Sequence, residues 1–496
     1  MTYRISRRFF LTSAASFAAL PACANAPDRS LRPEARGAGF HKKAVNGAEA
    51  LVEKAELGGK VAFSVVDAQS GLVLEQREAQ TGLPPASVAK ALTACYALTV
   101  LGPGHHFVTR LIATGGVSGG VVQGDLVLAG GGDPTLDTDA LAGLAARLKA
   151  AGVTGVKGRF LVWGGALPFV RGIDREQPDH VGYNPAVSGL NLNYNRVHFE
   201  WRKAGSGWNV TLDARSEKYR PDVRMARMEI VSRNVPIYTY KDAGGRDDWT
   251  VASGALGKGG ARWLPVRKPE LYAGEVFQTF AGAQGLRLPA PKLAQSLPDG
   301  AELARHESEP LRIVLRDMLK YSTNITAEAV GMTATIKRTG RPATLRASAN
   351  EMNRWAKETL GMHDVALVDH SGLGDASRMT ATDMTTALIS AHRRMGIKAI
   401  LKDIPMRDAK RKVIKDHPVK VHAKTGTLNF VSGLAGFIDA TDGTEMAFAI
   451  FCADIPRRNK LTLAERERPD GAKGWNTRAK VLQQDLIDRW SVLYGS

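Results

Sequence analysis

The sequence predicts a mixed α/β (α+β) fold in which one domain is interrupted by a long, mostly β insertion. Three observations lead to this prediction. The segments before residue 105 and after residue 308 combine helical periodicity with strand patterns. The middle of the chain, residues 105–305, instead shows short strand-like runs separated by glycine clusters. The chain has 496 residues, 44% of them hydrophobic, which is enough for several domains with their own cores.

Composition and charge exclude several other classes of protein. Apolar content is ordinary and no fixed period is found, so disordered, collagen-like and repeat architectures do not fit. Beyond the N-terminus no apolar run is long enough for a transmembrane helix. The net charge of +18 points to an anionic partner, but the basic residues are scattered and lack nucleic-acid motifs. We therefore expect a solvated basic surface, with short clusters such as Arg407, Lys410, Arg411 and Lys412.

The first 26 residues are typical of an export signal, which predicts a periplasmic protein. Arg7 and Arg8 precede a short apolar stretch that ends in an Ala-x-Ala sequence at Ala26. Paired arginines before Phe and Leu resemble a twin-arginine signal, and an ordinary Sec signal is the alternative. Cys23 lies in a sequence similar to a lipoprotein box, but the nearby proline is atypical, so cleavage after Ala26 is preferred to a lipid anchor. The remaining thiols, Cys95 and Cys452, are too few for a disulfide framework and are expected to be buried and free.

The N-terminal segment predicts a β-hairpin followed by a helix. Residues 60–67 and 71–77 are strand-like and are joined by a short polar turn. Two prolines then interrupt the chain before residues 87–101, whose apolar positions have helical spacing and which end at Gly102. In the middle segment, strands are expected at 109–113 and 126–129, and an amphipathic helix at about 138–151.

The C-terminal segment predicts helices followed by a strand meander. Helical patterns dominate from Leu311 onward, and residues 419–424 then alternate, with Val421 on one face and Lys424 on the other. Two further strands, at 430–439 and 445–454, are joined by an Asp-Gly turn, and a helix is expected at 478–494.

The first candidate for chemistry is Ser87-Val88-Ala89-Lys90. Residues three apart at a helix start lie on one face, so Ser87 and Lys90 are within reach of each other. The free backbone N–H groups and the dipole of a helix start also favour a developing oxyanion. Lys90 can act as a base if burial or a neighbouring cation such as Lys424 lowers its pKa. By itself the motif also fits a chance match.

The second candidate is Ser322-Thr323-Asn324. A strongly amphipathic helix at 311–321 leads directly into Ser322, and apolar residues follow. A polar step between two helices would aim Ser322 and Asn324 into a cleft, whereas a plain helix cap is the alternative for Ser322. Two other Ser-x-Asn sequences, at Ser232 and Ser348, lack this context.

The third candidate is Lys424-Thr425-Gly426-Thr427, which ends the alternating strand. Gly426 would let the backbone of a substrate approach the strand edge. The similar tripeptide at Arg338 closes a helical segment and is not expected to form a site.

Each motif is weak alone, but their order along the chain is specific. Ser-x-x-Lys, Ser-x-Asn and Lys-Thr-Gly in this order are the signature of penicillin-recognising serine enzymes. The chain resembles the class C low-molecular-mass penicillin-binding proteins, which are D-alanyl-D-alanine carboxypeptidases/endopeptidases. That family places two extra domains in the long segment between Lys90 and Ser322, which a β-lactamase does not need. Further matching stretches are 124–128 with 132–136, 369–373 and 432–437.

The resemblance implies a penicillin-binding/β-lactamase-like transpeptidase core with a five-stranded antiparallel sheet and a helical half. Two strands would come from 60–77 and three from 419–454. Two inserted, mostly β domains would interrupt this core. The expected boundaries are an export signal at 1–26, a catalytic domain at 27–104 and 308–496, inserted domain II at 105–130 and 201–307, and inserted domain III at 131–200.

The resemblance also implies a serine-type D-Ala-D-Ala carboxypeptidase or DD-endopeptidase that acts on peptidoglycan stem peptides or cross-links and is acylated by β-lactams. Ser87 would be the acylated nucleophile, and Lys90 would take its proton. Ser322 would relay a proton to the leaving amine, and Asn324 would hold the substrate amide and Lys90. No metal, cofactor or nucleic acid is implied.

The strand motif would then bind the end of the substrate. Lys424 and the Thr425 hydroxyl would bind the terminal carboxylate of D-alanine. The backbone N–H groups of Ser87 and Thr427 would form the oxyanion hole. In this family a nearby pocket recognises the free end of meso-diaminopimelate with an arginine and an aspartate. Arg378 and Asp179 are the candidates here, although residues 374–377 lengthen the loop before Arg378.

Two alternatives remain open. A serine β-lactamase or esterase on the same core is disfavoured by the long insertion, and a catalytically silent cell-wall-binding protein is disfavoured by the intact motifs. Other constellations fit less well. Asp369, His370 and Ser371 are the residue types of a catalytic triad. Adjacent residues of a sequence cannot face one another as the residues of a triad must, so a turn is expected here. The sequence contains no His-Glu-x-x-His and no Gly-Lys-Ser/Thr after the glycines at 130–132.

Overall fold

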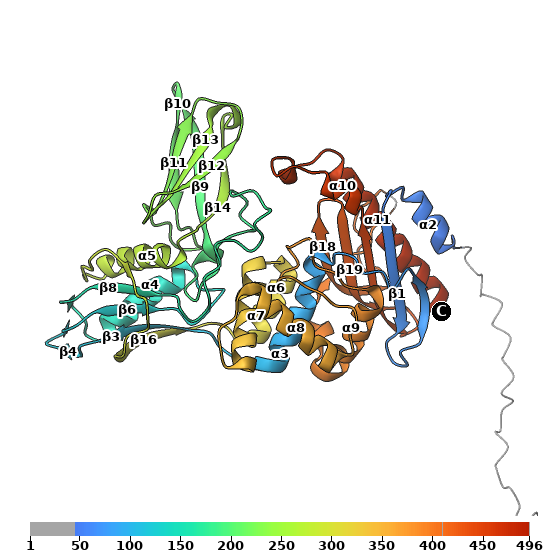
Figure 1. Ribbon diagram of the computed structural model, residues 1–496, viewed down its shortest axis with the longest axis horizontal. Coiled ribbons are helices and arrows are strands. Elements are labelled where there is room, and N and C mark those ends of the chain that lie inside the picture. Colours follow the sequence, from blue (N-terminus) through green and yellow to red (C-terminus); the bar gives the residue numbers. More distant parts are fainter. Residues whose placement is uncertain (1–44, 409, 496) are drawn as a thin grey trace, which may run out of the picture. The chain divides into compact units, whose positions relative to one another are not determined.

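A computed structural model describes residues 45–408 and 410–495 (Figure 1). The predicted export signal at 1–26, with Cys23, lies outside the described residues. Among the helices of the described part, none is long and apolar enough to cross a membrane. The predicted fold class is confirmed, because helices and antiparallel strands from both ends of the chain form one core.

The central element is a six-stranded antiparallel sheet with the order β17-β18-β19-β20-β1-β2. Five of its strands are those expected from the sequence: β1 (Lys60–Asp67), β2 (Val73–Arg77), β18 (Lys420–Leu428), β19 (Val431–Asp439) and β20 (Glu445–Ala453). The expected number of strands was too low by one, because β17 (Lys402–Asp403) adds a two-residue edge strand next to β18. So short a strand leaves no periodicity in the sequence.

Both faces of this sheet are buried. Along β20 the side chains of Ala447, Ala449 and Phe451 join one hydrophobic cluster, whereas those of Phe448 and Ile450 join another. The first cluster lies under five helices, and the second lies under two helices, one of which is the C-terminal helix. Those helices are α3 (Ala89–Leu101), α6 (Leu311–Tyr321), α7 (Asn324–Thr339), α8 (Leu345–Leu360) and α9 (Ala381–Met395) on one side, with α2 (Ala48–Lys54) and α11 (Ala472–Tyr494) on the other.

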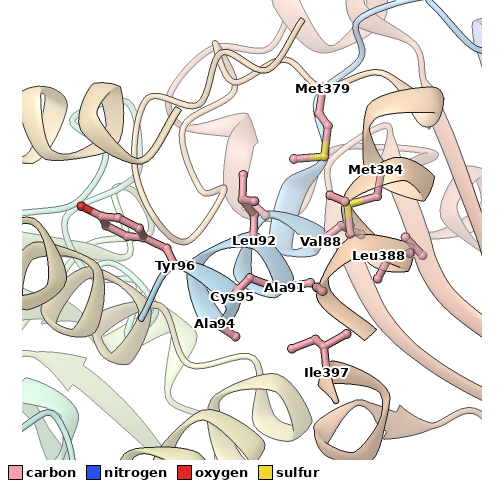
Figure 2. Packing of buried hydrophobic residues seen from close by; sticks show 14 of the residues in the cluster. Val88, Ala91, Leu92, Ala94, Cys95, Tyr96, Met379, Met384, Leu388 and Ile397 are labelled. Atoms are coloured by element: carbon pink, nitrogen blue, oxygen red, sulfur yellow. The ribbon is translucent and has the colours of Figure 1, made fainter. Parts of the chain in front are cut away.

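Helix α3 is buried on all sides, which explains its alanine- and leucine-rich sequence. Ten of its 13 residues are buried, and Leu92 and Tyr96 project from it toward different neighbours (Figure 2). A helix without a polar face has to lie inside the domain. Cys95 in this helix and Cys452 in β20 are both buried and free, as expected, and burial raises the pKa of each thiol to about 12.

The C-terminal helix is longer than expected. It begins at Ala472 rather than near residue 478, directly after Gly471, whose φ of 76° ends the preceding turn. Trp475 in the added part is fully buried, and its indole N–H donates to the carbonyl oxygen of Leu57 over 2.6 Å. This early anchor was not visible as apolar periodicity because the neighbouring residues are polar or small.

The insertion contains a second sheet with the order β15-β8-β6-β3-β16. The expected strands are present as β3 (Val108–Ala113) and β6 (Leu126–Ala129), and the expected helix as α4 (Thr138–Ala150). Strand β6 pairs in parallel with β8 (Phe160–Trp163), so this sheet crosses residue 130. The proposed division of the insertion into two domains stays a prediction. The other elements of the sheet are β15 (Lys292–Leu293), β16 (Ala301–Glu307) and the adjacent helix α5 (Pro269–Ala283).

Two three-stranded sheets complete the insertion between residues 196 and 265. One has the order β10-β9-β14 and the other β11-β13-β12. Their strands are β9 (Arg196–Ala204), β10 (Gly207–Asp213), β11 (Ala226–Val231), β12 (Tyr238–Asp242), β13 (Asp247–Ala252) and β14 (Gly259–Pro265). The remaining short strands, β4 (Val117–Ser118), β5 (Val121–Val122) and β7 (Gly155–Val156), form a small sheet of their own.

Candidate active site

Ser87 lies in a single 3-10 turn, Ala86–Val88, directly before α3. The α-helix therefore begins at Ala89, two residues later than expected. The reason is local: Pro84 and Pro85 precede the turn, and Ala86 has a φ of 47°, so the chain bends sharply before helical hydrogen bonding starts. The turn presents Ser87 at the mouth of a cavity while its neighbours Ala86 and Val88 are buried.

The side chain of Lys90 connects three segments of the protein. Its Nζ lies 2.8 Å from Ser87 Oγ, 2.7 Å from Asn324 Oδ1 and 2.8 Å from the carbonyl oxygen of Ser371. Lys90 is fully buried, and this burial lowers its pKa to about 8, while Glu328 and Asp369 act in the opposite direction. The predicted contact between Ser87 and Lys90 is therefore present, with the amine held in a fixed position.

Ser322 and Asn324 lie at the step between α6 and α7, as the sequence predicts. Ser322 takes the left-handed conformation with a φ of 60° and ends α6, and α7 begins at Asn324. Ser322 Oγ accepts a hydrogen bond from Lys424 Nζ over 3.0 Å, so this side chain is not used as a plain helix cap. Asn324 Nδ2 donates to the carbonyl oxygen of Tyr183 over 2.8 Å, which ties the insertion to this step.

Lys424 is the second buried lysine of the site. Its Nζ donates to Ser322 Oγ and to the carbonyl oxygen of Thr425, the latter over 2.7 Å. Burial lowers the pKa of Lys424 well below its ordinary value, and the positive charges of Lys90 and Lys402 add to this effect. Thr425 and Thr427 are exposed on the same strand, where they can meet a ligand.

Gly426 allows β18 to pass close to the nucleophile. A Cβ atom at this position would lie 2.5 Å from the carbonyl oxygen of Pro85 and 3.1 Å from the backbone nitrogen of Ser87. Any larger residue would therefore push the strand away from the Ser87 turn. The expected role of this glycine, close backbone approach, applies first to the protein's own chain.

A cavity of about 340 Å³ opens at Ser87. The predicted residues Ser322, Asn324 and Thr427 line it, together with residues that the sequence did not suggest. These additional residues are Gln177 and Tyr183 from the insertion, Gly372, Leu373, Leu428 and Asn429, and Arg458, Arg466, Glu467 and Asn476 from the C-terminal part of the chain.

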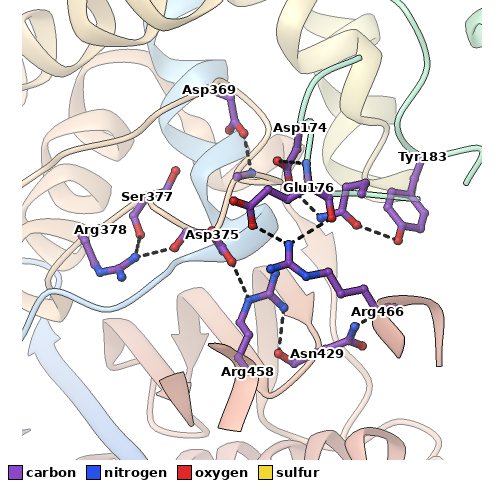
Figure 3. A network of polar contacts seen from close by, with 12 residues as sticks. Asp174, Glu176, Tyr183, Asp369, Asp375, Ser377, Arg378, Asn429, Arg458 and Arg466 are labelled. Atoms are coloured by element: carbon purple, nitrogen blue, oxygen red, sulfur yellow. Dashed lines mark hydrogen bonds and ion pairs between the residues drawn. The ribbon is translucent and has the colours of Figure 1, made fainter. Parts of the chain in front are cut away.

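The additional charged residues come from the segment between β20 and α11, residues 454–471. Arg458 is 4% exposed and donates from Nε to Asp375 Oδ2 over 3.2 Å and from Nη1 to the carbonyl oxygen of Asn429 over 3.0 Å (Figure 3). Arg466 donates from Nη1 to Glu176 Oε2 in the insertion over 2.7 Å (Figure 3). Segment 454–471 therefore contacts both the catalytic core and the insertion beside Ser87. Its polar, aperiodic sequence gave no signal of this position.

Glu467 extends this contact between the C-terminal segment and the insertion. Its carboxylate lies 2.7 Å from His180 Nε2 and 2.9 Å from Arg262 Nη2. The hydrogen bond from His180, against the effect of burial, lowers the pKa of Glu467 to about 2. The carboxylate is thus ionised at every pH at which the protein would be assayed.

The structure does not bring Arg378 and Asp179 together. Arg378 Nη1 donates to the carbonyl oxygens of Asp375 and Ser377 in its own loop, over 2.6 and 2.8 Å (Figure 3). The lengthened loop thus turns the guanidinium back on itself. Asp179 is half exposed and forms an ion pair of 3.6 Å with Arg171 in the insertion.

Asp369, His370 and Ser371 form a turn, as expected, and not a catalytic triad. His370 is fully buried, its Nε2 lies 2.8 Å from Ser348 Oγ, and burial lowers its pKa to about 3. The turn does take part in the site through its backbone, because the Ser371 carbonyl oxygen holds Lys90. Two buried carboxylates next to this turn, those of Glu328 and Asp369, were not predicted as site residues.

The chain is similar in sequence to a known protein family and to several known proteins. Residues 45–475 match the sequence profile of the D-Ala-D-Ala carboxypeptidase 3 (S13) family. A D-alanyl-D-alanine carboxypeptidase of an Actinomadura species is 27% identical over 433 residues, which cover 81% of this chain and 79% of the relative. The D-alanyl-D-alanine carboxypeptidase DacB of Haemophilus influenzae is 24% identical over 422 residues, which cover 81% of this chain and 87% of that protein.

The fold is similar to that of a solved structure, penicillin binding protein 4 (dacB) from Haemophilus influenzae. The match has a TM-score of 0.71 at 19% sequence identity and covers 90% of this chain and 100% of that chain. The same protein complexed with a novel β-lactam matches with a TM-score of 0.68 at 20% identity and covers 89% of this chain and 99% of that one.

Proposed function

The chain belongs to the D-Ala-D-Ala carboxypeptidase 3 (S13) family, and from this premise we propose that it removes the terminal D-alanine of peptidoglycan stem peptides through an acyl-enzyme on Ser87. The observation that carries the proposal is the position of Lys90 Nζ, 2.8 Å from Ser87 Oγ and 2.7 Å from Asn324 Oδ1. A buried amine with a lowered pKa beside a serine hydroxyl supplies both a base and a nucleophile.

In the acylation step, neutral Lys90 takes the proton of Ser87 Oγ. The oxygen then bonds to the carbonyl carbon of the penultimate D-alanine, and the negative charge moves to the carbonyl oxygen. We propose that the backbone N–H groups of Ser87 and Thr427 receive this oxyanion, which is supported by the presence of both residues in the lining of the cavity.

Expulsion of the terminal D-alanine requires a proton on its nitrogen. Ser322 is the donor in this proposal, and its hydroxyl is resupplied through Lys424 Nζ at 3.0 Å. The Nζ group of Lys424 and the exposed hydroxyl of Thr425 donate hydrogen bonds to the carboxylate of the leaving D-alanine. Lys90 passes the Ser87 proton to solvent, and Lys424 regains the proton that it supplied. Water then attacks the ester; Lys90 takes a proton from this water and returns it to Ser87 Oγ as the shortened peptide leaves.

The same acyl-enzyme serves a DD-endopeptidase reaction. In a cross-link, the leaving amine belongs to the side chain of a neighbouring stem peptide instead of to D-alanine, and the bonds that break and form are otherwise identical. We propose both activities for this site, with peptidoglycan as the substrate. Incubation with a cross-linked muropeptide dimer and with a pentapeptide monomer measures the two activities separately.

We also propose that β-lactams acylate Ser87. The strained β-lactam amide offers a carbonyl carbon at the position of the scissile peptide, and opening the ring leaves an ester on Ser87. The solved structure of the Haemophilus influenzae protein in complex with a β-lactam supports this step for a protein of the same fold.

Intact-mass spectrometry with benzylpenicillin tests the proposal, with Ser87→Ala as the matched control. The expected result is a penicilloyl adduct on the wild type that persists for minutes to hours, and no adduct on the variant. Rapid loss of the adduct with turnover of the drug would instead support a β-lactamase. No adduct on either protein, with no release of D-alanine from a pentapeptide, would support a wall-binding protein without catalysis.

We further propose that the protein is exported to the periplasm, where its substrate is found. The support is the sequence of residues 1–26, which carry three arginines, no acidic residue and a short apolar stretch. Fusion of this segment to a reporter, with and without replacement of Arg7 and Arg8 by lysine, distinguishes twin-arginine export from Sec export.

A further inference from the structure

The turn at residues 369–374 contacts Lys90 and is held by two buried carboxylates, that of Glu328 and that of its own first residue, Asp369. Glu328 on α7 accepts hydrogen bonds from the backbone N–H groups of His370 and Ser371, each over 2.9 Å. Asp369 accepts from the backbone N–H groups of Gly372 and Gly374, each over 2.6 Å. The turn is therefore held from both sides, and the Ser371 carbonyl oxygen that it exposes accepts from Lys90 Nζ.

The turn lies very close to the segment that carries the nucleophile. A Cβ atom on Gly372 would lie 1.9 Å from the carbonyl oxygen of Ala86, the residue before Ser87. A Cβ atom on Gly331 of α7 would lie 2.3 Å from the ring of His370. The 369–374 turn is thus packed between α7 and the Ser87 turn, and a shift of Glu328 would be passed on to Lys90.

The contacts on Glu328 differ from those of an ordinary structural carboxylate. Glutamate is rarely fully buried unless it is paired, and Glu328 is 0% exposed. It uses one oxygen for each N–H group, and these hydrogen bonds favour the ionised form against burial and the charge of Asp369, which raise the pKa of Glu328 to about 8. The positive charge that acts on Glu328 is the ammonium group of Lys90, which is equally buried.

From this arrangement we infer that Glu328 is a positioning residue for the acylation of Ser87: it fixes the Ser371 carbonyl oxygen that orients Lys90, and its negative charge sets the pH range in which Lys90 is a base. The inference rests on the proposed function. Neither Glu328 oxygen needs to touch the substrate for this role, because both are occupied by the turn.

The charges around Lys90 change its pKa in a defined direction. Glu328 and Asp369 both raise the pKa of Lys90 against the stronger lowering by burial. Burial and the negative charge of Asp369 in turn raise the pKa of Glu328, and Lys90 lowers it. The positive charge of Lys90 lowers the pKa of Lys424, and His370 stays neutral because burial lowers its pKa to about 3. Removal of the Glu328 charge therefore lowers the pKa of Lys90.

The test is the pH profile of the acylation rate constant with benzylpenicillin for Glu328→Gln, Glu328→Asp and wild type. In Glu328→Gln the amide group cannot accept both N–H groups, so the plateau rate falls about 10- to 100-fold. The rise of the rate constant with pH, called the acidic limb below, also moves to lower pH. We expect its midpoint to fall by about one to three pH units, because an opposite charge beside Lys90 is lost. Glu328→Asp keeps the charge, so its plateau falls but its limb stays close to that of the wild type.

Glu270→Gln is the matched control. Glu270 is a partly buried glutamate on α5 in the insertion, it accepts a hydrogen bond from Ser188 Oγ, and burial raises its pKa. Its replacement is expected to leave both the plateau and the limb unchanged. An unmoved acidic limb in Glu328→Gln overturns the inference whatever the plateau rate. Failure of the wild type to be acylated at all overturns the proposed function instead.

A second measurement needs no substitution at Glu328 and so does not depend on the stability of a variant. This measurement is an NMR titration of wild-type protein labelled with 15N-histidine and 13C-aspartate. A spectrum that requires a 13C-labelled residue directly before a 15N-labelled one shows only the three Asp-His pairs of the sequence, among them Asp369-His370. The His370 N–H donates to Glu328, so its chemical shift reports on that carboxylate. We expect it to titrate with the midpoint of the acylation limb, since coupled groups share macroscopic pKa values. A pH-independent shift would contradict the inference.

Discussion

The buried side chains of Lys90 and Lys424 each contact one of the two active-site serines: Lys90 Nζ lies 2.8 Å from Ser87 Oγ, and Lys424 Nζ lies 3.0 Å from Ser322 Oγ. In this arrangement each serine has its own source or acceptor of protons. The two proton transfers of the proposed reaction can therefore be disturbed one at a time.

Replacement of Lys90 by methionine should abolish most of the acylation. Methionine fills a similar volume but cannot take the Ser87 proton, and loss of a general base typically costs about 10²- to 10⁴-fold in rate. The acylation rate constant with a fluorescent penicillin measures the effect, and the melting temperature shows whether the variant is folded. A folded variant that is acylated within tenfold of the wild-type rate would exclude Lys90 as the base.

Replacement of Ser322 by alanine should affect peptides more than β-lactams. The leaving D-alanine needs a proton on its nitrogen, and Ser322 is the proposed donor, so the rate of D-alanine release should fall about 10²- to 10⁴-fold. An opened β-lactam keeps its amine tethered to the ester, so the initial adduct with benzylpenicillin should still form. Equal losses with both compounds would show that Ser322 acts before the leaving group departs.

The acylation rate should rise with pH through a midpoint near 8. The burial of Lys90 lowers its pKa to about 8, and only the neutral amine can accept the Ser87 proton. Below the midpoint the neutral fraction falls about tenfold for each pH unit, and above it the rate levels off. Stopped-flow acylation at saturating and subsaturating drug separates this limb from changes in binding. A limb near the ordinary pKa of lysine would contradict the role of burial.

Substitution of Gly426 by alanine should displace the nucleophile. The added Cβ would lie 2.5 Å from the Pro85 carbonyl oxygen, so the strand or the Ser87 turn must shift. Overpacking of this kind costs about 1–3 kcal/mol of stability, and acylation should fall as well. Gly143→Ala on α4 is the control, because its Cβ meets only the flexible end of Arg147 at 3.8 Å. Unfolding by urea and acylation assays compare the two variants.

Replacement of Arg466 by glutamine should change peptide binding without loss of stability. Its ion pair with Glu176 is partly solvent-exposed, and such pairs contribute about 0–1 kcal/mol. The residue lines the cavity at Ser87, however, so we expect the KM for a peptide substrate to change while acylation by benzylpenicillin stays within a few-fold of wild type. An unchanged KM for every peptide tested would place Arg466 outside the substrate path.

The sequence predicts the catalytic residues because their signals are local. Ser87 and Lys90 are one helical turn apart, and the helix at 311–321 has so strong an amphipathic pattern that the step at Ser322 is apparent without a structure. The strand that carries Lys424 is recognisable because only one of its faces is buried along its first residues.

The residues that were missed depend on contacts between distant segments. Glu328 looks like an ordinary helix residue until the 369–374 turn places two backbone N–H groups on its carboxylate. Arg458 and Arg466 lie in a polar segment without periodicity, and their position beside Ser87 follows only from their partners Asp375 and Glu176. The conformation of Arg378 was equally unpredictable, since it depends on the path of a loop that is longer than expected.

The pairing of β1 with β20 has a consequence for how the protein folds. Lys60 is opposite Ala453, so the strand next to the nucleophile segment meets its partner only when nearly the whole chain has been synthesised. Until then the edge of β1 that later pairs with β20 is also open, a state in which chains tend to aggregate or to need chaperones. The two three-stranded sheets between residues 196 and 265 use neighbouring segments and can form earlier. Closure of the central sheet is thus a late, non-local event, and it is expected to be slow.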